Sequence, residues 1–152
     1  MCENGQHCSN IPVHPRYHQI AHHEYTRALR DAFWHGVRTQ IQRLDNKLIP
    51  YNEARREIQS STLQCRGVAE IEIDSIVGSS GRFRDFDMTY LPLRRADDDR
   101  WVNVAQAHFE GITLPPVKLY KIDDVYFVED GNHRVSVARV LGHTSIRAKV
   151  VE

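Results

Sequence analysis

The sequence lacks long apolar runs, an excess of either charge and a cysteine framework. Its 152 residues contain no stretch close to the roughly 20 consecutive apolar residues that a membrane helix needs. The N-terminus has no apolar signal-peptide segment, which predicts a cytoplasmic protein with no membrane partner. Three cysteines, Cys2, Cys8 and Cys65, are too few and too scattered for a disulfide framework. The 20 basic and 20 acidic residues cancel, which argues against a wholly basic platform for nucleic acid.

The N-terminal part is predicted to be helical. Residues 1–15 hold glycine and proline without any apolar period, so we expect a flexible leader there. An N-terminal helical segment, 16–62, follows, ended at first by Pro50 and resumed as a short helix capped by Asn52. Its apolar stripe, repeating every three or four residues, consists of Leu29, Phe33, Val37, Ile41, Leu44 and Leu48.

Residues 67–152 alternate strand and helix patterns, which predicts an α/β domain with a small mixed sheet. The expected strands are Val68–Ile76, Val117–Ile122, Val125–Glu129 and a last one with Ile146, Ala148 and Val150. The expected helices are Arg100–Glu110 and His133–Leu141. Asp123 and Asp124 form the turn of a hairpin, and Gly142 ends the last helix.

Nine histidines are many for this length, and one group of them has a spacing that metal ligands can have. His14, His18 and His22 follow one another at four-residue spacing, near Cys2 and Cys8. Such spacing could share a metal ion, but a polar helix face explains it better, since no cysteine pair has zinc-finger spacing. His108 lies on the apolar face of its helix and is predicted to be a core residue.

The corner between the last hairpin and the last helix has the composition of an anion site. A strand that turns into a helix presents unpaired backbone N–H groups and the positive end of the helix dipole. Gly131 permits a positive φ and a close approach of a ligand to the main chain, next to Asn132. Arg134 adds a forked donor, and His133 a donor or proton carrier. Asp130 would repel a bare phosphate, so it is expected to bind Mg²⁺, cap the helix or hold Arg134.

A second candidate lies in the glycine-rich loop of residues 78–87. Arg82 and Arg84 suit a phosphate clamp, and Asp85 and Asp87 suit a Mg²⁺ ligand or a general base. The alternative is a salt-bridged surface loop. Burial of Phe83 and Phe86 is expected to anchor this loop.

The C-terminal part resembles the ParB/sulfiredoxin superfamily over about residues 68–152. The motif comprises a Pro-Pro strand, a hairpin, an Asp-Gly-x-His-Arg corner, a helix ending in Leu-Gly and a closing strand, here LPPVKLYKIDDVYFVEDGNHRVSVARVLGHTSIRAKVVE. The segment IEIDSIVGSSGRFRDFD resembles the first strand and loop of the same fold. The nearest resemblance is to a ParB-like group of unknown function that carries this same corner.

The resemblance implies that the corner binds nucleotide phosphates, with ATP, ADP or CTP as the ligand and Mg²⁺ beside it. It places those phosphates on Gly131, Asn132, His133 and Arg134. It also places a catalytic carboxylate in the loop after the first strand, where this chain has Asp85 and Asp87. Sulfiredoxins need a cysteine directly before the His-Arg pair, where this chain has Asn132, so a sulfinic acid reductase is not expected.

Two functions therefore remain open. The first is a nucleotide-binding NTPase or small-molecule kinase, with Asp85, Asp87 and His133 as its catalytic residues. The second is a non-catalytic, DNA-associated or regulatory module of ParB type, with a partner or a homodimer formed through the N-terminal helices. A basic side would then bind DNA through Arg27, Arg30, Arg38, Arg43, Arg55 and Arg56. The sequence names neither the base nor the phosphate acceptor.

Overall fold

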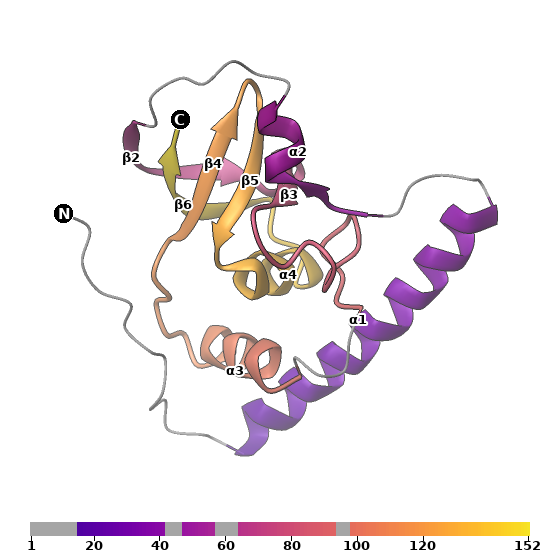
Figure 1. The fold of residues 1–152 in the computed structure, drawn as a ribbon. Helices are drawn as coiled ribbons and strands as arrows, with labels where there is room; N and C mark the ends of the chain where they lie inside the picture. The colour runs from indigo at the N-terminus through magenta and orange to yellow at the C-terminus, as the bar shows by residue number, and fades with distance from the viewer. Residues whose placement is uncertain (1–14, 42–46, 57–63, 94–97) are drawn as a thin grey trace.

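The computed structural model describes residues 15–41, 47–56, 64–93 and 98–152. Figure 1 shows a mixed sheet with helix α4 against it and helices α3 and α1 beyond α4. The mixed α/β class predicted from the sequence is confirmed. The helices are α1 (Pro15–Ile41), α2 (Tyr51–Arg56), α3 (Asp98–Phe109) and α4 (Asn132–Val140), with a 3₁₀ turn at Ile73–Ser75. None of the helices in these ranges is long and apolar enough to span a membrane.

The sheet has six strands in the order β1-β3-β5-β4-β6-β2. They are β1 (Ile49–Pro50), β2 (Cys65–Glu72), β3 (Ile76–Ser79), β4 (Val117–Ile122), β5 (Val125–Asp130) and β6 (Ser145–Val151). β3 runs parallel to both β1 and β5, and β4 runs parallel to β6. The β4–β5 and β2–β6 pairs are antiparallel. The predicted hairpin is confirmed, with a positive φ of 51° at Asp123 in its turn.

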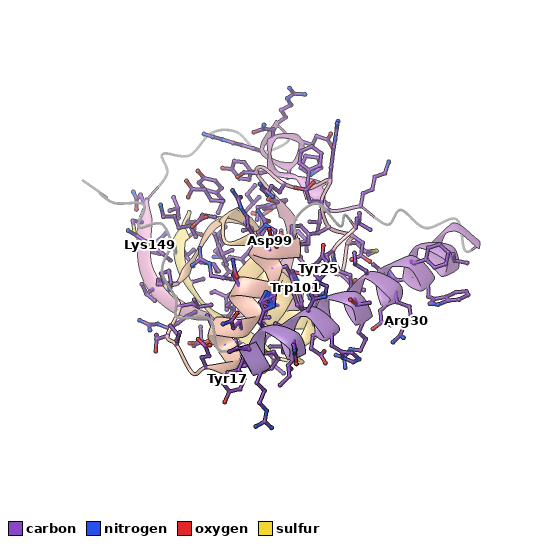
Figure 2. All side chains as sticks on the ribbon, turned by 90° about the horizontal axis from the view of Figure 1, so that it is seen from below. Tyr17, Tyr25, Arg30, Asp99, Trp101 and Lys149 are labelled. Atoms are coloured by element: carbon purple, nitrogen blue, oxygen red, sulfur yellow. The ribbon has the colours of Figure 1, made fainter. Side chains whose placement is uncertain are left out.

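Helix α1 buries a different face from the one its large apolar residues predicted. Phe33 stands 64% exposed, whereas Tyr25 is 1% exposed and packs on Trp101 of α3 with ring centroids 5.3 Å apart (Figure 2). Among residues 15–37 of α1, whose side chains are described, the other buried ones are Ala21, Ala28 and Ala32. The predicted stripe is buried in part: Leu29 packs against the core and Leu48 is 1% exposed, whereas Phe33 meets solvent. Small side chains let two helices approach closely, which suits the alanines to this contact of α1 with α3. Leu44 of that stripe lies outside the described residues.

The predicted strand over Val68–Ile76 is divided. β2 ends at Glu72, the 3₁₀ turn follows, and Ile76 opens β3. Ala69, Ile71 and Ile73 alternate with acidic residues, which predicts that they share the core-facing side of the strand. Ile71 and Ile73 are buried, but Ala69 is exposed. The reason is that β2 is an edge strand, paired only with β6 and poorly covered. Alternation in the sequence cannot reveal where a strand breaks or how well it is covered.

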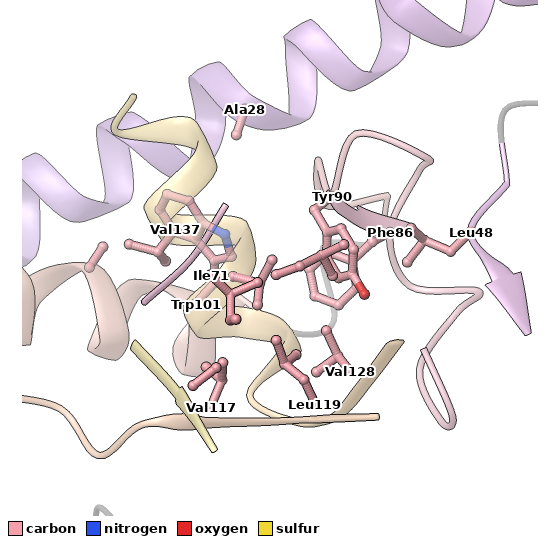
Figure 3. Close-up of a cluster of buried hydrophobic side chains, with 14 of the residues drawn as sticks. Ala28, Leu48, Ile71, Phe86, Tyr90, Trp101, Val117, Leu119, Val128 and Val137 are labelled. Carbon is pink, nitrogen blue, oxygen red and sulfur yellow. The ribbon is translucent and has the colours of Figure 1, made fainter. Parts of the chain in front are cut away.

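The core lies between the sheet and α4, α3 and α1 (Figure 3). Its largest fully buried side chain, Trp101, donates its indole N–H to Oγ of Ser136 at 2.9 Å, which joins α3 to α4. α4 contributes Val135 and Val137, and the sheet contributes Val117, Leu119 and Val128. The prediction that His108 is a core residue is wrong, because the side chain lies on an exposed part of α3. The apolar residues of α3 are buried or pack against the core, and His108 lies beside that face rather than in it.

Candidate functional site

The two segments singled out in the sequence meet at one edge of the sheet. β3 and β5 are neighbouring parallel strands, so the loop after β3 and the corner after β5 start at the same edge. Nη1 of Arg82 lies 3.5 Å from Nε2 of His133, and the rings of Phe86 and His133 meet edge to face at 5.4 Å. The structure thus brings the arginine loop against the first turn of α4.

The corner depends on Gly131, which precedes α4. Its φ of 105° lies in the left-handed region that L side chains rarely adopt. A Cβ built there would lie 2.6 Å from Cγ1 of Val117 and 3.0 Å from Nη2 of Arg134. The close packing therefore needs glycine. The first turn of the helix that follows carries the backbone N–H groups and the positive dipole end expected of an anion site.

Arg134 is engaged within the protein itself. Its Nη1 donates to the carbonyl oxygens of Pro115 at 2.5 Å and Pro116 at 3.2 Å, and its Nη2 to Oδ2 of Asp130 at 2.8 Å. The Arg134 side chain is only 15% exposed, whereas that of Asp130 is 64% exposed. Of the three tasks considered for Asp130, holding Arg134 is the one that this geometry displays. Through these contacts Arg134 connects the corner to Pro115 and Pro116, which precede β4.

Asn132 is the first residue of α4 and is 7% exposed. Its Oδ1 is buried without a hydrogen-bond partner among the described residues. A buried polar atom left unpaired costs about 1–3 kcal/mol, so such atoms usually have a partner. Turning the amide by 180° would place its NH₂ group there instead, so this position can offer an acceptor or a donor. An external ligand is one way to satisfy it.

The two carboxylates of the loop, Asp85 and Asp87, differ in burial. Asp87 is fully buried, and its Oδ1 accepts hydrogen bonds from N of Thr89 at 2.8 Å, Oγ1 of Thr89 at 2.7 Å and N of Leu91 at 2.9 Å. Its Oδ2 lies 3.0 Å from Nδ1 of His35. Asp87 thus holds the loop in shape. Asp85 is partly exposed, with Oδ2 3.6 Å from Nη1 of Arg82.

The rest of the loop is fixed by burial and by Tyr90. Phe86 is 1% exposed and Phe83 packs against the core, in agreement with the anchoring role predicted for both. Tyr90 donates its hydroxyl to the carbonyl oxygen of Gly78 at 2.6 Å. Burial raises the pKa of Tyr90 well above its usual value, so this donor stays protonated. Arg84 is exposed, with its guanidinium 5.5 Å from the Phe83 ring.

Near this loop, no sequence signal indicates His35, and the sequence pattern assigned Gly78 to the wrong element. His35 comes from α1, 52 positions before Asp87, so its contact with the loop is visible only in the folded chain. Gly78, read as the start of the loop, is the third residue of β3, where an added Cβ would clash with the carbonyl oxygen of Ile49 and the ring of Phe127.

The histidines and arginines of the N-terminal helices lie apart from the corner and the loop of residues 78–87 in the sequence, and the structure describes only some of them. Among the described residues, no three His, Cys, Asp or Glu side chains gather in a group that could hold a metal ion. The rings of His18 and His22 stack at 6.3 Å, and the leader with His14 lies outside the described part of the chain. Of the arginines proposed for DNA, Arg27 pairs with Glu24 at 2.7 Å and Arg55 lies over the Tyr51 ring.

Comparison with known proteins gives few relatives. No family model matches the chain, and no curated protein matches it. Among solved structures, the chain is similar to the crystal structure of sulfiredoxin from Arabidopsis thaliana, at 19% sequence identity and a TM-score of 0.42. The match covers 55% of this chain and 82% of that chain. The function of this chain is therefore inferred from its own residues.

Proposed function

We propose that this chain binds the phosphate groups of a nucleotide where the loop after β3 meets the first turn of α4. The observation that carries the proposal is the position of the Arg82 guanidinium, 3.5 Å from His133 in that turn. A forked donor and a helix N-terminus face the same place from two segments, which is the usual composition of a phosphate site. The unpartnered Oδ1 of Asn132 supports a polar ligand at the same turn.

Each neighbouring residue then has a defined part. Backbone N–H groups of the first turn of α4 and the Arg82 guanidinium bind phosphate oxygens, and His133 donates or carries a proton. The contact of Arg82 with Asp85 is 3.6 Å long and partly exposed, so it offers little resistance to a competing phosphate. Arg84 is exposed on the same loop and adds positive charge. Arg134 positions the corner and is not assigned to the ligand.

A nucleotide would bring Mg²⁺, and the described residues offer it single carboxylates rather than a cage. That fits Mg²⁺, which in nucleotide sites takes most of its ligands from phosphates and water and only one or two from carboxylates. Asp85 and the exposed oxygen of Asp130 are the candidates, whereas buried Asp87 holds the loop. If phosphate is hydrolysed or transferred, Asp85 is the carboxylate we assign as the general base.

Calorimetric titration of the full chain with ATP, ADP, CTP and GTP, each with Mg²⁺, tests the proposal. Arg82→Ala should weaken binding by roughly 10- to 100-fold, because a hydrogen bond to a charged group contributes about 1.5–3 kcal/mol. Arg147→Ala is the matched control, since Arg147 is exposed on β6. The proposal fails if no nucleotide binds at millimolar concentration, or if Arg82→Ala binds as the unchanged chain does.

A further inference from the structure

Two histidines from distant parts of the chain face each other beside the C-terminal end of α4. His108 belongs to the last turn of α3, and His143 follows the glycine that ends α4. Their Nε2 atoms lie 3.3 Å apart, although 35 positions separate them in the sequence. The ring centroids are 4.8 Å apart and the rings are nearly perpendicular, at 84°. Because the nitrogens are closer than the centroids, both lie on the facing sides of their rings.

The separation of the two nitrogens is that of a long hydrogen bond and also that of two ligands of one metal ion. Hydrogen bonds from N–H groups usually span about 2.7–3.2 Å between heavy atoms, so 3.3 Å is long for one. Two imidazole nitrogens at about 2.0–2.1 Å from one tetrahedral Zn²⁺ are separated by about 3.3–3.4 Å. The side chains therefore already have the spacing of adjacent metal ligands.

The backbone on both sides of the pair is fixed by hydrogen bonds. N of His143 donates to O of Ala138 at 2.9 Å, and O of the next residue, Thr144, accepts from N of Ile73 at 3.0 Å. On α3, O of His108 accepts from N of Gly111 at 3.1 Å. Both side chains are exposed, so an ion and its water ligands can reach them. Folding thus brings the two imidazoles together, so binding an ion needs little further ordering of the chain.

We propose that His108 and His143 form a two-histidine chelate for a divalent transition-metal ion of the Zn²⁺, Ni²⁺ or Cu²⁺ class. Imidazole nitrogen favours these ions over Mg²⁺ and Ca²⁺, which take oxygen ligands. No third His, Cys, Asp or Glu joins the pair within the described ranges, so water completes the coordination. The nine residues of α4 span roughly 14 Å at 1.5 Å per residue, which keeps this ion well away from the corner.

A bound ion would link α3 to the turn after α4 and so stabilise the folded chain. Ligands that bind only the folded state raise its melting temperature by mass action. Zn²⁺ at a hundredfold excess over its Kd should raise the Tm by roughly 5–10 °C for a chain of this size. Mg²⁺ at the same concentration should not, because its preferred ligands are oxygens.

The test is a Zn²⁺ titration and melting series on the EDTA-treated full chain. His108→Gln and His143→Gln should each abolish the binding of one Zn²⁺ equivalent or weaken its affinity strongly. The loss of affinity should exceed the roughly 10- to 100-fold that follows from losing an outer-shell partner of a metal ligand. The double variant His18→Gln/His22→Gln is the matched control, because it removes a second pair of histidines, whose rings stack on α1. It should keep both the equivalent and the rise in Tm, and circular dichroism verifies that each variant folds.

Two results would overturn the proposal. One is a chain that binds no Zn²⁺ at up to about 1 mM, a limit that already corresponds to a weak −4.1 kcal/mol. The other is a double variant His108→Gln/His143→Gln whose stoichiometry and Tm response equal those of the unchanged chain. A third result would also refute it. If the His18/His22 variant lost its bound Zn²⁺ while the His108/His143 variant kept it, the ion would bind on α1.

Discussion

Nδ1 of His35 lies 3.0 Å from Oδ2 of Asp87, and this contact ties helix α1 to the loop of the candidate site. Asp87 is fully buried, while the His35 side chain is 31% exposed. A buried carboxylate is tolerated only where hydrogen bonds satisfy it, and here the three described donors to Oδ1 belong to Thr89 and Leu91, which directly follow the loop. The N-terminal helix therefore supports the shape of the loop that carries Arg82.

Asp87→Ala should destabilise the chain strongly. The change leaves the backbone N–H groups of Thr89 and Leu91 without their acceptor, at about 1–3 kcal/mol for each buried donor. We expect a total loss of about 3–5 kcal/mol in urea denaturation, as for other broken buried networks. Asp85→Ala, at a partly exposed position of the same loop, should cost less than about 1 kcal/mol. Equal losses in the two variants would contradict the role given to Asp87.

Gly131→Ala should cost more than Gly142→Ala, although both glycines have a positive φ. Gly142 has a φ of 80° and open space around its missing side chain, so alanine there adds only the backbone cost of about 1–2 kcal/mol. At Gly131 a Cβ also meets Val117 at 2.6 Å, which adds about 1–3 kcal/mol of overpacking. Denaturant midpoints of the two variants measure the difference. Identical midpoints would show that the corner is not closely packed.

The sequence predicted the C-terminal third well because its signals are local. The hairpin turn at Asp123, the positive φ of Gly142 and the alternation of β6 each depend on a few adjacent residues. That the loop of residues 78–87 lies near the corner at Gly131 was implied only by the family resemblance. No pattern in the residues predicts this contact. β1, only two residues long, gave no signal because its pairing with β3 is entirely non-local. The same holds for His35 with Asp87, whose residues meet only in the folded chain.

The docking of α1 shows where an apolar pattern misleads. Phe33 weighs heavily in any hydrophobicity average, so a stripe that contains it is predicted to be buried, yet Phe33 is exposed while Leu29 of the same stripe packs against the core. Alanines contribute little to such an average, yet Ala21 and Ala28 are each 1% exposed or less. Close helix contact depends on small size as well as apolar character, and a periodicity based on hydrophobicity alone cannot weigh the two.

Tyr25→Ala and Phe33→Ala distinguish the two faces of α1. Removing the buried ring of Tyr25, which packs on Trp101, should cost about 3–5 kcal/mol of unfolding free energy. Removing Phe33, which is 64% exposed, should change it by about 0.5 kcal/mol or less. Chemical denaturation followed by Trp fluorescence measures both. If Phe33→Ala were the more damaging change, the stripe read from the sequence would be the true packing face.

Arg134→Lys separates a positioning residue from a phosphate ligand. The guanidinium spans two proline carbonyls and Asp130 at once, and a single ammonium on a flexible stem cannot reproduce this fork. We therefore expect a loss of about 0.5–1.5 kcal/mol in the absence of any nucleotide, because hydrogen bonds to exposed and half-buried acceptors are lost. Arg147→Lys, on an exposed part of β6, should be neutral. A ligand role would give the opposite result: unchanged stability without nucleotide, and a weaker affinity when nucleotide is titrated.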